Sequence, residues 1–216
     1  MQEWEVQYHA ILQQMEKNPI LHPLGDGPMT PMIWYKLPMP GCQCAGGYPY
    51  CLYLKRGRTD NLIVFLIGGG LSWKEETARG SGTVARTLQG KTVFYTDEVT
   101  PGNDRWFFFL PENQGLFTLG ADNRFADWNI AMINYGTADF HIGQSDFTYT
   151  GEDGERHVLH HCGYANFRAS LDEIKRRMPP PSKLLIAGES AGAFAVPALA
   201  ADIADAWPEC DDLTIC

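Results

Sequence analysis

A serine between two glycines, in Gly188-Glu-Ser190-Ala-Gly192, constrains the fold of this chain more than any other feature. The pattern G-x-S-x-G is typical of a sharp turn between a strand and a helix, because glycines remove Cβ atoms that the turn would bring into collision. An apolar run precedes the motif and an alanine-rich stretch suited to a helix follows it, although Pro197 is expected to kink that helix. The motif therefore predicts a strand, a turn carrying Ser190, and a helix. A glycine-rich turn with no chemical role is the alternative.

Short apolar runs and one helical pattern make up much of the remaining chain. The expected strands cover residues 51–55, 62–67, 130–134, 184–187 and 213–215. Residues 164–178 carry apolar side chains at spacings of three and four, which predicts an amphipathic helix ended by Pro179-Pro-Pro181. This order predicts an α/β fold with a mostly parallel sheet and helices on both faces. Residues 96–127 are aromatic and rich in glycine and proline, and are expected to be irregular.

Charge and hydropathy exclude several classes of partner. The chain has 17 Lys and Arg against 26 Asp and Glu, a net charge of −9, which argues against nucleic-acid binding because phosphate neutralisation needs a basic face. The longest uncharged apolar stretch, 62–73, is too short to span a membrane and contains three glycines. Residues 1–20 lack the apolar core of a signal peptide, so we expect a cytoplasmic protein, or a secreted one if Met1 is not the native start.

Neither the cysteines nor the histidines predict a metal site. Cys42, Cys44 and Cys51 are clustered, but a zinc site would need CxxC pairs at matching distance, so reduced or structural thiols are favoured over the metal alternative. His160 and His161 are adjacent and point in different directions, which favours packing at a helix start over metal binding. We therefore expect no metal and no organic cofactor.

Three glycines end the strand expected over 62–67. Acyl-transfer enzymes need N–H donors aimed at the developing oxyanion. In α/β-hydrolases one donor follows the nucleophile, here Ala191, and another comes from a glycine-rich loop after an early strand, here Gly69 or Gly70. A plain turn also explains the three glycines when they are taken alone.

Four blocks follow one another along the chain, NLIVFLIGGGLSWKEET, FADWNIAMINYGTADFHIGQ, HHCGYANFRASLDEIKRR and LLIAGESAGAFA. With them, the stretch from about Gly41 to the C-terminus resembles the pectin acetylesterase / Notum family of serine carboxylesterases. It implies an α/β-hydrolase fold with Ser190 as nucleophile and an oxyanion hole from the Gly69/Gly70 loop and the Ala191 N–H. Trp73 lies where the family places an aromatic residue beside the acyl pocket. We expect Asp139 and His141 to line the substrate pocket as well.

The resemblance also sets the expected domains and activity. Residues 1–40 are interpreted as an N-terminal helix (3–17) and a connector with six prolines, and 41–216 as the N-terminal part of a catalytic domain. The family removes short acyl groups, often acetyl, from carbohydrate or protein substrates. Its members commonly have one cysteine directly before the tryptophan and a second a few residues later, which form a disulfide. Here Ser72 and Ala78 stand at those two positions, so that disulfide cannot form, which fits a reducing compartment.

No histidine follows Ser190, whereas α/β-hydrolases place the nucleophile, the acid and the histidine in that order. We interpret the chain as part of a longer protein whose sheet is incomplete here. The acid and the base would then lie in a C-terminal portion, with a second chain after cleavage as one form that this portion could take. His141 as the base is the alternative, at the carboxyl edge of the sheet but in the wrong chain order.

The expected function is a serine esterase acting on a small acyl ester, with a carbohydrate as one candidate carrier. A catalytically inactive hydrolase-like binding protein is the alternative from a different class. A serine peptidase is a third option, which one sequence does not separate from an esterase.

Overall fold

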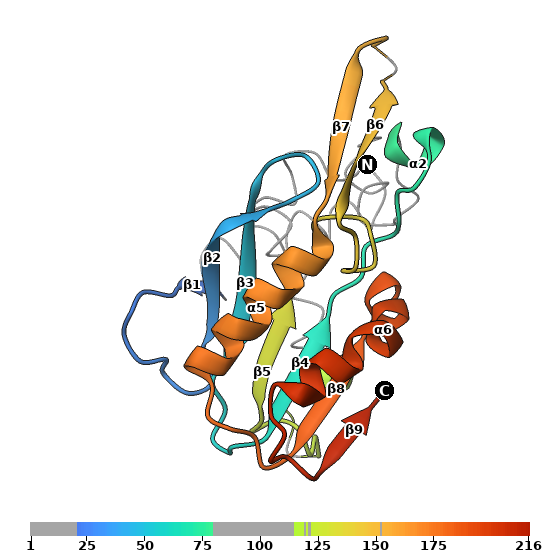
Figure 1. Ribbon diagram of the computed structural model, residues 1–216. Coiled ribbons are helices and arrows are strands. Elements are labelled where there is room, and N and C mark those ends of the chain that lie inside the picture. Colours follow the sequence, from blue (N-terminus) through green and yellow to red (C-terminus); the bar gives the residue numbers. More distant parts are fainter. Residues whose placement is uncertain (1–20, 80–114, 119, 121, 152) are drawn as a thin grey trace, which may run out of the picture.

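The computed structural model (Figure 1) describes residues 21–79, 115–118, 120, 122–151 and 153–216. Within these residues the main sheet contains seven strands in the order β1-β2-β3-β5-β4-β8-β9. The helix expected over residues 3–17 lies outside these residues. The elements are β1 (Leu21–Pro23), β2 (Trp34–Gln43), β3 (Pro49–Lys55), β4 (Leu62–Leu66), α2 (Glu75–Arg79), the 3₁₀ turn η1 (Gly115–Phe117), β5 (Asn129–Ile133), β6 (Ser145–Thr150), β7 (Arg156–His161), α5 (Gly163–Arg177), β8 (Leu184–Gly188), α6 (Ala191–Asp205) and β9 (Leu213–Ile215).

Four neighbouring strands, β5, β4, β8 and β9, run parallel to one another. Leu66 of β4 pairs with Ile133 of β5 on one side and with Gly188 of β8 on the other, so these three strands end at the same level. The segments that follow them therefore meet at one edge of the sheet, where ligands bind in open α/β sheets.

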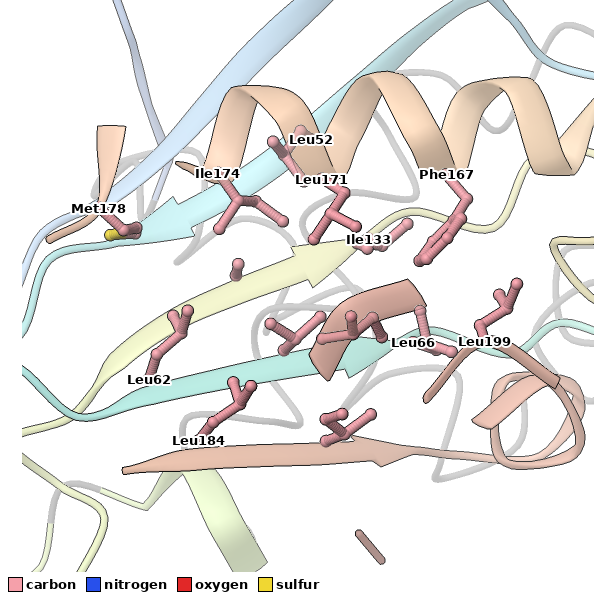
Figure 2. Close-up of a cluster of buried hydrophobic side chains, with 14 of the residues drawn as sticks. Leu52, Leu62, Leu66, Ile133, Phe167, Leu171, Ile174, Met178, Leu184 and Leu199 are labelled. Atoms are coloured by element: carbon pink, nitrogen blue, oxygen red, sulfur yellow. The ribbon is translucent and has the colours of Figure 1, made fainter. Parts of the chain in front are cut away.

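Side chains alternate between the two faces of the sheet, as strand geometry requires. One face carries Leu52, Leu62, Val64 and Leu66 and is covered by α5 and α6. Figure 2 shows Phe167, Leu171 and Ile174 of α5 pointing into this cluster. Burying such a side chain is worth about 1.5–3 kcal/mol, so packing on the sheet stabilises α5 far more than its helix propensity does.

The opposite face packs against shorter elements. Ile63, Ile130 and Met132 contact Ala78 of α2, Phe117 of η1 and residues of β6 and β7 within a second buried cluster. The predicted α/β fold, with a mostly parallel sheet and helices on both faces, is confirmed in the described residues.

The proline-rich segment differs from its interpretation as a connector. Residues 34–43 form β2, and Pro38 lies opposite Cys51 of β3. Prolines are tolerated there because the pairing with β3 shifts register between Pro38 and Gln43, while β1 pairs only with residues 34–36. The boundary drawn between residues 40 and 41 thus falls inside a strand.

A hairpin of β6 and β7, which the sequence patterns did not indicate, projects past the end of the main sheet next to α2 (Figure 1). The Thr150 N–H donates to Glu75 Oε1 at 3.1 Å, which ties the hairpin to α2. The rings of Phe147 and Tyr149 are stacked 6.5 Å apart on one face of the hairpin. Within the described residues, none of the helices has the length and apolar character needed to cross a membrane.

Candidate active site

Ser190 occupies the turn between β8 and α6 in a conformation that is rare for a residue with a side chain. Its φ is 49° and its ψ is −122°, and its side chain is exposed. Non-glycine residues held in sparsely populated backbone regions cost about 1–3 kcal/mol and persist only where the surroundings enforce them. The predicted strand–turn–helix unit is confirmed, and this strained serine is the arrangement that the G-x-S-x-G pattern is known to produce.

The positions on both sides of the Ser190 turn require glycine because backbone atoms approach them closely. A Cβ on Gly192 would lie 2.0 Å from the Leu66 carbonyl oxygen, and a Cβ on Gly188 would lie 2.6 Å from the carbonyl carbon of Gly192. The turn is therefore tight because α6 begins directly against the end of β4. Hydrogen bonds from Glu189 N–H to Leu66 O (3.2 Å) and from Gly192 N–H to Glu189 O (2.7 Å) close it.

The glycine loop after β4 lies against this turn. A Cβ on Gly68 would meet the Glu189 carbonyl oxygen at 2.3 Å and the Ala191 nitrogen at 2.8 Å. Gly70 has a φ of 92°, in the region that favours glycine. The structure thus brings the two segments predicted to supply oxyanion donors, Gly68–Gly70 and Ala191, into direct contact. Their role as donors stays a prediction.

The Glu189 side chain adjoins the same contact. Although much of this side chain is exposed, loss of hydration around its carboxyl group raises the pKa of Glu189, and a hydrogen bond with the Gly68 backbone opposes the rise. The carboxyl group therefore belongs to the immediate surroundings of Ser190.

The segment after β5 holds the glycine loop from the other side. The Tyr135 hydroxyl donates to the Gly70 carbonyl oxygen at 2.8 Å and accepts from the Phe140 N–H at 3.0 Å. The His141 Nε2 lies 2.8 Å from the Ile67 carbonyl oxygen, and because a carbonyl only accepts, this nitrogen carries the proton. The Ser72 N–H donates to Ala138 O at 2.9 Å.

Asp139 is buried within this segment and accepts hydrogen bonds from three groups. They are the Thr137 hydroxyl at 2.7 Å, the His141 N–H at 3.1 Å and the Gly163 N–H at the start of α5 at 2.7 Å. A Cβ on Gly163 would lie 2.2 Å from the Asp139 carboxylate, so that position has no room for a side chain. Asp139 therefore joins the segment to α5, and its place in a substrate pocket stays a prediction.

His141 is also internal, with 2% of its surface exposed. Burial lowers its pKa to about 4, an effect that the bond to Ile67 and the Asp139 charge partly oppose. The ring is consequently neutral near pH 7. Because its Nε2 is bonded to Ile67, the geometry gives little support to the alternative of His141 as the base, and its assignment to the substrate pocket stays a prediction.

Two large aromatic side chains are exposed, one in the segment between the glycine loop and α2 and the other on α6. Trp73 is 59% exposed, and the Trp73 N–H donates to the Thr77 hydroxyl at 3.1 Å. Phe194, in the first turn of α6, is 75% exposed and its ring centroid lies 5.7 Å from that of Phe140. Phe194 was not among the residues predicted for the site. Its position four residues after Ser190, on the same helix face as the turn, is the signal that could have identified it.

The remaining candidates for metal binding have other contacts. His160 Nδ1 lies 2.8 Å from Asp146 Oδ1, and the His161 ring stacks on Phe147 with centroids 6.1 Å apart. No group of three His, Cys, Asp or Glu side chains suited to a metal occurs in the described part of the chain. All six cysteines are free thiols, and Ser72 and Ala78 are both buried.

Comparison with known proteins identifies the fold. No family model matches this sequence, and no curated protein matches it. Two crystal forms of the Wnt deacylase Notum from Drosophila are similar in structure, each with 17% sequence identity and a TM-score of 0.55. The match covers 83% of this chain and 49% or 50% of the Notum chain, so this chain spans about half the length of the solved structures that it matches. Together with the strand order and the tight serine turn, this likeness shows that the chain has an α/β-hydrolase-like fold.

Proposed function

We propose that this protein is a serine hydrolase that cleaves carboxylic esters of small acyl groups, with Ser190 as the nucleophile. The observation that carries the proposal is the strained, exposed conformation of Ser190 between β8 and α6. Strain of this kind is maintained against a cost and is concentrated at functional sites. The likeness of the fold to a deacylase supports the choice of an acyl ester as substrate.

The chemistry begins with attack of the Ser190 Oγ on the ester carbonyl carbon. The carbonyl oxygen becomes an oxyanion, which in this mechanism accepts hydrogen bonds from the N–H groups of Ala191 and of Gly69 or Gly70. Ala191 is the first residue of a 15-residue helix, where N–H groups have no partner within the helix and the helix dipole favours negative charge. Loss of one such donor typically lowers turnover by a factor of about 10²–10³.

Collapse of the tetrahedral intermediate expels the alcohol and leaves Ser190 acylated. Water then attacks the acyl group and regenerates the serine. Both steps need a base that accepts a proton and returns it. We assign this base and its acidic partner to residues outside the 216 of this sequence, because the histidines within it all precede Ser190 and the Nε2 of His141 is bonded to Ile67.

Trp73, Asp139 and His141 are assigned to the substrate pocket, with the exposed Trp73 at its wall and the buried Asp139 and His141 in the layer behind that wall. The partners proposed are a small acyl-ester substrate, with a carbohydrate as one candidate carrier, and the C-terminal portion of the same protein.

The test compares Ser190→Ala with Ser182→Ala, a matched change at an exposed serine just before β8. The protein is produced from its complete reading frame and assayed with p-nitrophenyl acetate and with a fluorophosphonate that labels activated serines. We expect labelling and turnover in the wild type and in Ser182→Ala, and loss of both in Ser190→Ala. If Ser190→Ala retains turnover, the assignment of Ser190 as the nucleophile is refuted. A wild-type protein that neither reacts nor turns over identifies the inactive binding protein instead.

A further inference from the structure

Both ends of the glycine loop are held by side chains from a single segment. At the start of the loop His141 Nε2 donates to Ile67 O, and at its end the Tyr135 hydroxyl donates to Gly70 O, each at 2.8 Å. The loop between them has no side chains with which to hold itself. These two long-range bonds and the contact of Gly68 with the serine turn therefore contribute to holding it in place.

The two bonds act on the predicted oxyanion donors through the planar peptide. In each peptide unit the N–H points opposite to the C=O, so fixing the Ile67 and Gly70 carbonyls orients the two units that contain them. Only two peptide units lie between, and their N–H groups belong to Gly69 and Gly70. Anchoring the flanking carbonyls thus restricts the directions in which those N–H groups can point.

We propose that Tyr135 and His141 are positioning residues that hold the Gly68–Gly70 loop in the geometry needed to stabilise the oxyanion, an inference that rests on the proposed esterase function. Neither side chain is placed on the substrate. They act by keeping donors oriented before the reaction begins, which is where electrostatic stabilisation gains its advantage over water.

The protonation states of the two side chains suit this role. Burial raises the pKa of Tyr135 and lowers that of His141 to about 4. The phenol therefore keeps its proton near pH 7, and the neutral imidazole carries its single proton on the Nε2 that faces the Ile67 carbonyl. The rings also contact each other, with centroids 4.8 Å apart, so the two anchors form one packed unit.

The segment that carries the anchors is itself held under strain. Ala138, Phe140 and His141 have φ values of 58°, 57° and 59°, all in the left-handed region, although none is a glycine. Asp139 keeps them there by accepting from the Thr137 hydroxyl and the His141 N–H and by binding the start of α5. A segment that served only to connect β5 to β6 would have no need of three strained residues in four.

The test uses Tyr135→Phe in the full-length protein, with Tyr50→Phe as the matched control. Tyr50 is also buried, and its hydroxyl donates at the same 2.8 Å to the carbonyl of Asn134 rather than to a carbonyl of the glycine loop. Steady-state kinetics with p-nitrophenyl acetate give kcat and KM. Hydrogen exchange of the peptide spanning residues 67–73 reports on the loop directly.

We expect Tyr135→Phe to lower kcat by about tenfold or more with KM within about twofold, part of the 10²–10³ that one donor supplies. Exchange in the loop peptide should become faster, whereas Tyr50→Phe should change neither quantity. His141→Gln, whose amide N–H also reaches a carbonyl, should retain more activity than His141→Leu. Equal kcat in Tyr135→Phe and Tyr50→Phe overturns the proposal, as does faster loop exchange without loss of kcat.

These outcomes are separable from failure of the esterase assignment. If the wild type and Ser190→Ala are equally inactive, the proposed function fails and with it the catalytic part of the inference. The exchange data then decide only whether the two side chains brace the loop.

Discussion

Replacing Gly192 by alanine is the sharpest structural test of the serine turn. The added Cβ would lie 2.0 Å from the Leu66 carbonyl oxygen and 2.6 Å from the Leu66 carbonyl carbon. Both are backbone atoms of the last residue of β4, which is paired with strands on both sides, so no side chain can rotate away to make room. The start of α6 must move away from β4 by more than about 1 Å to reach ordinary van der Waals contact.

The cost of this movement follows from known effects of overpacking. Forcing one extra methyl group into a close-packed site costs about 1–3 kcal/mol, and we expect the upper part of this range because only backbone can yield. For a chain of about 200 residues, 1 kcal/mol corresponds to about 2–4 °C in Tm. A displacement near 1 Å at a catalytic group can also lower the rate by about 10².

The assay is urea unfolding followed by circular dichroism, combined with turnover of p-nitrophenyl acetate. Gly25→Ala is the control, because a Cβ at Gly25 meets nothing within 4 Å and its φ is not in the left-handed region. We expect Gly192→Ala to lose stability and turnover together and Gly25→Ala to keep both. A Gly192→Ala protein within about 0.5 kcal/mol of the wild type and fully active would refute the close approach of α6 to β4.

Three further predictions concern the surroundings of the loop. The pKa of His141 is about 4 in the folded protein against an ordinary 6.5, so between these values the unfolded chain binds a proton that the native state does not bind. The free energy of unfolding should therefore fall by on the order of 3 kcal/mol as the pH drops from about 6.5 to about 4. Urea unfolding at pH 7 and pH 4.5 should show a smaller acid loss in His141→Gln than in the wild type. Asp139→Asn should cost about 1–3 kcal/mol in the same assay, because its amide N–H₂ would face a donor such as the Gly163 N–H. Trp73→Ala should leave stability within about 0.5 kcal/mol, since the side chain is 59% exposed, yet raise KM across a series of p-nitrophenyl esters.

The sequence predicted the strands that are continuous apolar runs and the helix whose apolar side chains recur at spacings of three and four. The strands β4, β5 and β8 and the helix α5 lie within one or two residues of their expected bounds, and α6 is the helix expected after Ser190. Their patterns are strong because each buries a continuous row of apolar side chains. Strand β2 was missed because prolines outweigh its alternation, and β6 and β7 because Thr, His and Asp dilute theirs.

The arrangement around Ser190 was predictable only in part. The glycine pattern was enough to predict the turn, because the reason for those glycines is local. The bonds from Tyr135 and His141 to the glycine loop span 65 and 74 residues, and they join side chains to backbone carbonyls. Such contacts produce no recognisable pattern of residue types in a sequence, because every residue has a backbone carbonyl. His141 was expected at the carboxyl edge of the sheet, but the direction of its ring depends on the left-handed backbone of the segment after β5.

The distribution of backbone strain connects these loops to the proposed chemistry. The non-glycine residues with positive φ in the described ranges are Met32, Ala138, Phe140, His141 and Ser190. All but Met32 lie directly after β5 or β8, at the edge where the parallel strands end. Each left-handed residue costs roughly 1–2 kcal/mol, so this edge carries a substantial part of the stability of an ordinary domain as strain. A sequence selected for stability alone would place glycine or asparagine at such positions. Two of the retained side chains make contacts that glycine would lose, His141 to the Ile67 carbonyl oxygen and Phe140 to Phe194 of α6. The strain is therefore best explained by the need to fix Ser190 and the glycine loop in one relative position.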